Sequence, residues 1–374
     1  MTQVQGYAAP RFSAVKDIFA ASFARGEELG ARFSLVQAGE TLIDLWGGYA
    51  DRAAARPFDE QTLTPVFSTT KAVTAFMVAR LVEQGKITYE EPVSRVWPEF
   101  AQAGKDDVTI AQALSHQAGL SGFPDAMDPA DWFDWDGVCA RLAAMAPLWK
   151  PGTASGYHPS TFGFIAGEIF RRADGRTIGA ALAQDVCAPH ELDLWIGLPE
   201  TEHHRCADIA RPRGLPDFGE VNEATRAAFL TGWSAPGGRS QTQWRLAEFP
   251  GANGHATALA LARLMAALAD DGWLDGDVIL APAVIAEATA ERIQGQDLVL
   301  PFRMSWAAGF MRNAALRVWG PGDQTFGHSG WGGSCAFADP ERRLGGAYVM
   351  NRQSTALLGD TRPGALIDAV YAAL

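Results

Sequence analysis

The sequence Phe67-Ser68-Thr69-Thr70-Lys71 places a hydroxyl and an amine three residues apart. On a helix, residues at this spacing share a face, so the Lys71 amine can reach the Ser68 hydroxyl. A serine attacks a carbonyl carbon when a neighbouring group takes its proton and when donors hold the oxyanion that forms. The N-terminus of a helix supplies free N–H groups and a partial positive charge for that purpose. The spacing therefore predicts a nucleophilic Ser68 with Lys71 as its proton acceptor.

The same spacing occurs once more, at Ser13 and Lys16. Residues 10–28 have apolar residues at helical spacing, which predicts a surface helix with no apolar strand leading into it. We interpret that pair as part of a solvated face. Ser68, in contrast, follows an apolar entry over 64–67 and opens a strongly apolar segment, 69–84, that ends at Gly85, which predicts a buried helix. This context favours Ser68 as the nucleophile.

Two later segments are candidates to complete the site. A loop over 151–160 brings Tyr157 to the start of a helix predicted over 160–173. Near the end of the chain, residues 326–334 are mostly small and enter a predicted strand, so a backbone edge there can approach a ligand closely.

The order Ser68 and Lys71, then Tyr157, then His328 and Gly330 resembles the three motifs of the serine β-lactamase and penicillin-binding-protein superfamily. It is most similar to class C β-lactamases and to the carboxylesterases of bacterial esterase family VIII. The resemblance covers nearly the whole chain, including residues 91–93, 114–120 and 252–257.

This resemblance implies roles for the motif residues. Ser68 forms an acyl-enzyme, while Lys71 and Tyr157 together accept and return its proton. Burial favours a neutral Lys71 and Tyr157, whereas their proximity favours the charged pair, and both forms stay open at this point. The backbone N–H groups of Ser68 and Trp331 hold the oxyanion, although an alignment on residues 331–333 would move the second donor to Ser334.

The chain departs from the β-lactamase pattern at two motifs. His158 and Pro159 follow Tyr157, so the asparagine that β-lactamases use near the substrate amide is absent. His328 replaces the lysine of the third motif. Because histidine is mostly neutral at pH 7, this change weakens recognition of a carboxylate. The residues expected to contact substrate are His158, Trp233, His328, Ser329, Gly330 and Trp331.

Other histidines and tryptophans have less specific interpretations. His116 is expected to orient the loop below the site rather than to act on substrate. His203, His204 and Asp208 are residue types that bind metals. Adjacent histidines point in divergent directions, however, so no third ligand is placed, which favours a solvated loop and no metal. Trp132 and Trp135, like Trp233 and Trp331, are candidates to line an apolar acyl pocket.

Composition excludes several classes of function. The chain has 374 residues, 31 Lys+Arg against 43 Asp+Glu, and a formal net charge of −12. This balance argues against nucleic-acid and membrane-surface partners, which need basic patches. The four cysteines are scattered, residues 1–7 lack a secretory pattern and no run of 18 apolar residues occurs, so a cytoplasmic protein with reduced cysteines is expected. No cofactor is expected, and the oligomeric state stays open.

The order of predicted elements indicates an α/β (α+β) β-lactamase-like fold. Strands near both termini are expected to form one antiparallel sheet flanked by helices. The predicted hairpins centre on 38–40, on Asn313 between 307–311 and 315–319, and on 339–341, and a helix follows over 361–374. We expect residues 1–90 and 291–374 to form this domain and 91–290 to form an inserted, mainly helical domain, with the site in the cleft between them.

The sequence thus predicts a metal-free serine carboxylesterase acting on small or short-acyl esters. The enzymic alternatives are a β-lactamase, a D-alanyl-D-alanine peptidase or an acyltransferase, since all share the acyl-enzyme. An alternative of another class is a ligand-binding or acylated sensor protein. Steady turnover of an ester distinguishes an enzyme from a sensor, which reacts once.

Overall fold

A single antiparallel sheet dominates the computed structural model, which describes residues 4–232 and 241–374. The strands run in the order β1-β3-β2-β15-β14-β13-β12-β11-β10, with β4 paired to β3. Their bounds are β1 (Gln5–Ala8), β2 (Gly30–Gln37), β3 (Glu40–Asp51), β4 (Arg56–Pro57), β10 (Ile293–Gln296), β11 (Arg303–Trp306), β12 (Met311–Arg312), β13 (Phe326–Ser329), β14 (Cys335–Asp339) and β15 (Leu344–Met350).

The two ends of the chain meet at the centre of this sheet. Strand β2 pairs antiparallel with β15 along its whole length, with Phe33 opposite Tyr348. The turn between β2 and β3 is tight because Ala38 and Gly39 both adopt the left-handed conformation. The predicted α/β class, with a sheet built from both termini, is confirmed.

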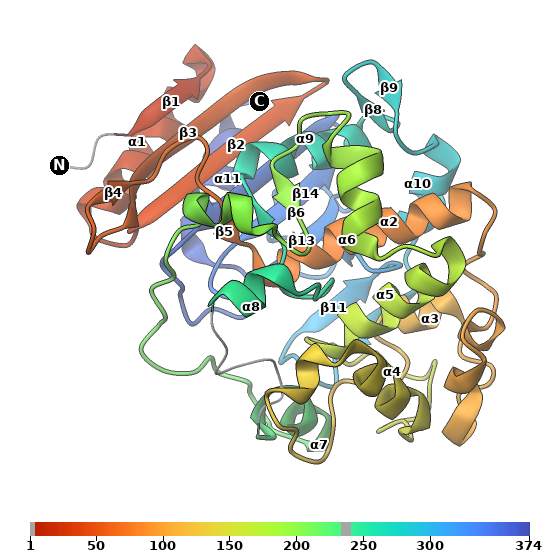
Figure 1. The fold of residues 1–374 in the computed structure, drawn as a ribbon. Helices are drawn as coiled ribbons and strands as arrows, with labels where there is room; N and C mark the ends of the chain where they lie inside the picture. The colour runs from red at the N-terminus through yellow and green to blue at the C-terminus, as the bar shows by residue number, and fades with distance from the viewer. Residues whose placement is uncertain (1–3, 233–240) are drawn as a thin grey trace.

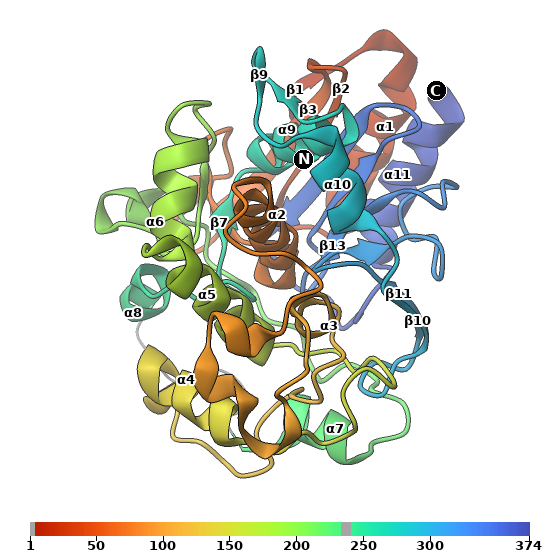
Figure 2. The ribbon, with the colours of Figure 1, turned by 90° about the vertical axis from the view of Figure 1, so that its right-hand side faces the viewer.

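Helices cover both faces of the sheet, as Figures 1 and 2 show. Helix α1 (Ser13–Ala24) packs with α11 (Thr361–Ala373) on one face. Helix α9 (Ala258–Ala269) packs on the other face, against β2, β14 and β15. Helix α2 (Thr70–Glu83) follows the predicted nucleophile and is almost entirely buried. It packs against α5 and contacts β13, and so joins the sheet to the helix-rich region.

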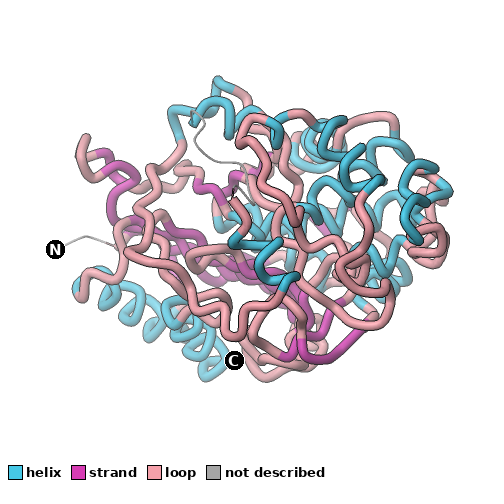
Figure 3. Tube along the Cα trace, turned by 90° about the horizontal axis from the view of Figure 1, so that it is seen from below, coloured by secondary structure: helices cyan, strands magenta, loops and turns pink. Residues whose placement is uncertain are grey.

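The helix-rich region lies to one side of the sheet (Figure 3). Its helices are α3 (Ile110–Leu114), α4 (Trp135–Ala144), α5 (Thr161–Asp174), α6 (Ile178–Leu182), α7 (Glu223–Thr225) and α8 (Gln241–Leu246), and α10 (Pro282–Thr289) packs on α2. Two small sheets accompany these helices. One has three strands, β5 (Thr64–Pro65), β7 (His255–Ala256) and β6 (Leu194–Trp195), and the other pairs β8 (Trp273–Leu274) with β9 (Asp277–Val278).

Two sequence expectations differ from the structure. Residues 315–319 are not a strand: β12 pairs with β13, and the Asn313 side chain closes a loop by donating to Gly320 O (2.9 Å) and Gly322 O (2.8 Å). The segment 91–290 also contains α9, which covers the sheet rather than joining the other helices. An apolar helix signals burial, but its sequence does not say which surface buries it.

Over the described ranges, no helix is both long and apolar enough to cross a membrane. All four cysteines are buried free thiols.

Candidate active site

The nucleophile lies on a strained turn at the start of α2. Phe67 adopts a left-handed φ of 48°, which is uncommon for a bulky residue, and Ser68 follows it in a short 3₁₀ turn. The Thr70 hydroxyl donates to Phe67 O and accepts from Gly254 N at 2.8 Å, so side-chain contacts hold the turn in place. Strain of this kind gathers at functional sites, where the surrounding structure maintains it.

Lys71 points back at Ser68 from the first turn of α2. Its Nζ lies 3.1 Å from Ser68 Oγ, 2.8 Å from Pro159 O and 2.7 Å from Gly251 O. The side chain is fully buried, and burial moves the pKa of Lys71 well below its usual value. No acidic group is among the causes of that shift. Burial therefore favours the neutral form of the amine.

Tyr157 approaches Ser68 from the loop before α5. Burial raises the pKa of its phenol, and the nearby Ser68 side chain opposes that shift. The ring stacks on Trp306, with centroids 5.8 Å apart, and Lys71 Nζ lies 4.9 Å from its centroid. The structure thus brings the three residues predicted from the first two motifs together at one hydroxyl.

A buried carboxylate that sequence reasoning missed positions the Tyr157 loop. Asp297 Oδ1 accepts from the N–H groups of Tyr157 (2.9 Å), Val299 (3.0 Å) and Leu300 (3.0 Å). Its Oδ2 accepts from two side chains, those of Ser155 (3.0 Å) and Trp306 (3.2 Å). The five donors come from three separate segments, so no local pattern marks Asp297 as part of the site.

The third motif lies on β13 and the loop after it. His328 points toward Lys71 and Tyr157, and burial lowers its pKa to about 3. Its Nδ1–H donates to Ser329 O (2.7 Å), which leaves Nε2 as an acceptor without a partner among the described residues. The histidine that the sequence resemblance aligned with the third-motif lysine is therefore neutral.

The two backbone amides predicted to hold the oxyanion belong to Ser68 and Trp331. In the part of the chain that the structure describes, neither Ser68 N nor Trp331 N donates to a protein acceptor. Gly330 packs against the nucleophile turn so closely that a Cβ there would lie 2.3 Å from Val66 O. This close packing brings the loop that carries the Trp331 amide next to the turn that carries Ser68.

Some expected contacts are not placed at the site. His158 is fully buried, its Nδ1 bonds Gly156 O (2.6 Å) and its Nε2 accepts from Leu120 N (3.0 Å). Because both ring nitrogens are engaged, the prediction that His158 contacts substrate is wrong. His116 packs edge-on to Tyr157 and accepts from His158 N (3.2 Å), in line with an orienting role. Trp233 lies outside the described residues.

The predicted acyl-pocket tryptophans on and before α4 line a separate cavity. Trp132 and Trp135 border a space of about 310 Å³ together with Phe249 and with Gly167 of α5. The Trp135 indole donates to Glu168 at 2.8 Å. The cavity lies beside the middle of α5, whereas Tyr157 precedes the start of that helix.

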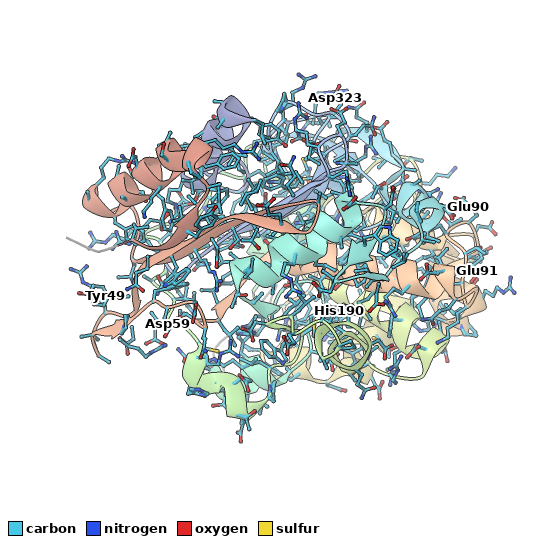
Figure 4. The ribbon with its side chains drawn as sticks, turned by 90° about the horizontal axis from the view of Figure 1, so that it is seen from above. Tyr49, Asp59, Glu90, Glu91, His190 and Asp323 are labelled. Atoms are coloured by element: carbon cyan, nitrogen blue, oxygen red, sulfur yellow. The ribbon has the colours of Figure 1, made fainter. Side chains whose placement is uncertain are left out.

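The groups with metal-ligand chemistry are dispersed. His203 bonds Leu198 O and His204 bonds Thr201 O, so each ring is engaged by a backbone carbonyl close to it in sequence. Glu90, Glu91 and Asp323 lie toward the rim of the molecule in Figure 4, away from His190, which is labelled near its middle. Among the described residues, no three such groups lie close enough to hold a metal ion.

Comparison with known proteins places this site in a family. The family model described as beta-lactamase matches residues 15–370. The chain belongs to the beta-lactamase family. It is 34% identical over 365 residues to the esterase/beta-lactamase LipL of Mycobacterium tuberculosis, covering 94% of this chain and 83% of that protein.

Two solved structures are similar over their full length. A penicillin-binding protein homolog from Caulobacter crescentus is 60% identical with a TM-score of 0.98, and the match covers 100% of both chains. A family VIII carboxylesterase is 43% identical with a TM-score of 0.92, again covering 100% of both chains. These relatives confirm the resemblance seen in the sequence, and the chain is an enzyme of the serine hydrolase class.

Proposed function

We propose that this beta-lactamase family member is a carboxylesterase that hydrolyses small, short-acyl esters through an acyl-enzyme on Ser68. One observation carries the proposal: the Ser68 hydroxyl lies 3.1 Å from the buried Lys71 amine, and that amine lies 4.9 Å from the centroid of the Tyr157 ring. The names of LipL and of the family VIII carboxylesterase support the same activity.

The contacts of Lys71 suit a neutral amine that acts as the proton acceptor. Such an amine has two N–H donors and one lone pair. With the two N–H groups donated to the carbonyls of Pro159 and Gly251, the lone pair is left to accept the Ser68 proton. Burial lowers the pKa of Lys71 and raises that of Tyr157, which favours the neutral pair over the charged one.

The reaction then takes two balanced half-reactions. Ser68 Oγ bonds to the ester carbonyl carbon as its proton passes to Lys71, and the N–H groups of Ser68 and Trp331 hold the oxyanion. The intermediate collapses, the C–O bond to the alcohol breaks, and Lys71 returns the proton to the departing alkoxide, to which Tyr157 donates a hydrogen bond. Water repeats the sequence on the acyl-enzyme and releases the acid and free Ser68.

Neutral substrates fit the third motif better than anionic ones. His328 stays uncharged across the physiological range because burial lowers its pKa to about 3. No cation at this position pairs with the carboxylate of a β-lactam or of a peptide. We therefore propose His328, Ser329, Gly330 and Trp331 as the edge that an uncharged ester lies along.

Turnover of p-nitrophenyl butyrate tests the proposal. Ser68→Ala is expected to abolish release of p-nitrophenol, while Ser13→Ala, the matched variant at the second, exposed Ser-x-x-Lys pair, stays within about twofold. Steady release supports an esterase, and a single stoichiometric burst supports a sensor. Faster turnover of nitrocefin than of the ester would favour a β-lactamase. Equal loss in both variants contradicts the choice of Ser68.

A further inference from the structure

The loop at 330–334, which carries the proposed Trp331 oxyanion donor, is fixed on two sides. The loop closes on itself through Gly330 N to Ser334 O (2.7 Å) and Gly333 N to Gly330 O (3.1 Å). One side of it faces the nucleophile turn, and the other faces the start of α11. Each side has its own anchoring side chain.

Ser334 is the anchor toward the nucleophile. Its buried hydroxyl donates to Val66 O (2.8 Å) and lies 3.1 Å from Thr69 Oγ1. Val66 precedes the strained Phe67–Thr69 turn that presents Ser68, and Thr69 is its last residue. This contact therefore sets the distance between the two segments that carry the oxyanion donors.

Arg362 is the anchor on the far side. Its Nη2 donates to Gly332 O at 2.7 Å, and Ser354 N donates to the same carbonyl at 3.0 Å. A guanidinium has five N–H donors. The remaining four bond Asp360 through both of its carboxylate oxygens, Glu28 Oε2 (3.2 Å) and Arg352 O (2.8 Å). With every donor engaged and only 8% of the side chain exposed, Arg362 is held in one orientation.

The glycines of the loop fit this clamp. Gly333 has a φ of +123°, and a Cβ there would lie 2.6 Å from Asp360 Oδ2 and 2.7 Å from Arg362 Nη2. Gly332 has a φ of +86° and packs against Gln353 in the same way. The backbone can approach Arg362 this closely only without side chains.

We infer that Arg362 and Ser334 are positioning residues that clamp the 330–334 loop from opposite sides and thereby aim the Trp331 amide at the substrate oxyanion. This inference rests on the proposed function, in which Trp331 N is the second oxyanion donor. Neither side chain enters a proton transfer. They act on the transition state because an oxyanion donor works only when it is held at the place where the charge develops.

Arg362→Lys and Ser334→Ala test the inference, with Arg25→Lys as the matched control. The exposed Arg25 side chain makes a two-bond ion pair with Glu27 at 2.8 Å and donates to no residue of the clamp. Lysine keeps the charge of Arg362 but lacks the fork that reaches Gly332 O together with both carboxylates. Each variant is titrated with a p-nitrophenyl phosphonate, so that kcat is expressed per reactive serine and unfolded protein is not counted.

We expect kcat per titrated site to fall at least about tenfold in both test variants, with KM within about twofold and the control unchanged. The inhibition constant of a boronic acid, whose tetrahedral adduct places an oxygen in the oxyanion site, is expected to rise in proportion. A merely structural role predicts a lower melting temperature with unchanged kcat per site, which would overturn the inference.

If Arg362→Lys yields no folded protein, Ser334→Ala decides by the same criterion, because it removes one hydroxyl and no charge. The inference alone is refuted if the wild-type enzyme hydrolyses the ester and reacts with the phosphonate, while both test variants have the same kcat as the wild type. The proposed function and the inference are refuted together if the wild-type enzyme neither hydrolyses the ester nor reacts with the phosphonate.

Discussion

Replacing Asp297 by asparagine should loosen the Tyr157 loop and reduce both stability and turnover. Asparagine offers one carbonyl oxygen, and the best orientation directs it at the three amides, which leaves its NH₂ group facing the Trp306 indole N–H. That buried donor then has no acceptor, at a cost of about 1–3 kcal/mol. The amide bonds to the former carboxylate weaken as well, because a neutral acceptor binds less strongly.

We therefore expect Asp297→Asn to lose about 2–4 kcal/mol in the free energy of unfolding, measured by urea denaturation. Asp323→Asn is the matched control. Asp323 pairs with Arg317 at 2.9 Å, both side chains are more than half exposed, and it lies at the rim of the molecule in Figure 4. Loss of this exposed ion pair should lower the free energy of unfolding by less than about 1 kcal/mol.

The kcat for p-nitrophenyl butyrate should fall about tenfold or more in Asp297→Asn and stay unchanged in the control, because a displaced Tyr157 no longer meets Ser68. Equal stability of the two variants, together with wild-type kcat in both, would refute the reasoning. It would mean that the buried carboxylate does not hold the loop.

Three further predictions follow from burial and packing. Burial raises the pKa of Glu28 to about 7, against the opposing effect of Arg362. The folded protein therefore holds this proton more tightly than the unfolded chain, and the free energy of unfolding should fall as pH rises from about 4.5 to 7. Glu28→Gln should remove that pH dependence when unfolding is measured with urea. A persisting slope contradicts the assignment. Gly330→Ala should lower kcat at least about tenfold, because its Cβ would lie 2.3 Å from the carbonyl oxygen of Val66 beside the nucleophile. Gly364→Ala in α11 is its control. A Cβ there meets nothing within 4 Å, so this variant should be more stable by up to about 1 kcal/mol in thermal unfolding. Since burial lowers the pKa of Lys71, kcat/KM for a neutral ester should level off well below pH 10.5, and a profile still rising at pH 10 would contradict a neutral amine.

Local signals in the sequence predicted the parts of the site that depend on local spacing. The Ser68 and Lys71 pair follows from one helical turn, and the end of its helix follows from Gly85, which adopts a φ of +66°. The hairpin turn at 38–39 likewise uses residues that tolerate the left-handed conformation. Such features need only neighbours along the chain.

Features built from distant segments were not predictable in this way. Asp297 collects donors from residues 155, 157 and 306, and Arg362 reaches the loop after β13 from the start of α11. Pro159, at the position where β-lactamases carry asparagine, contributes a backbone carbonyl to Lys71, which a side-chain motif cannot reveal. The residues at 315–319 are mostly apolar, which favours a strand, but the Asn313 side chain satisfies the nearby carbonyls and closes a loop.

The most direct measurement of the central claim is the site of covalent labelling. After reaction with a p-nitrophenyl alkylphosphonate, peptide mass spectrometry should find one phosphonyl group per chain, on the peptide that contains Ser68. Ser13→Ala should label to the same extent and Ser68→Ala not at all. A label on another residue, or full esterase activity after complete labelling, would contradict the account.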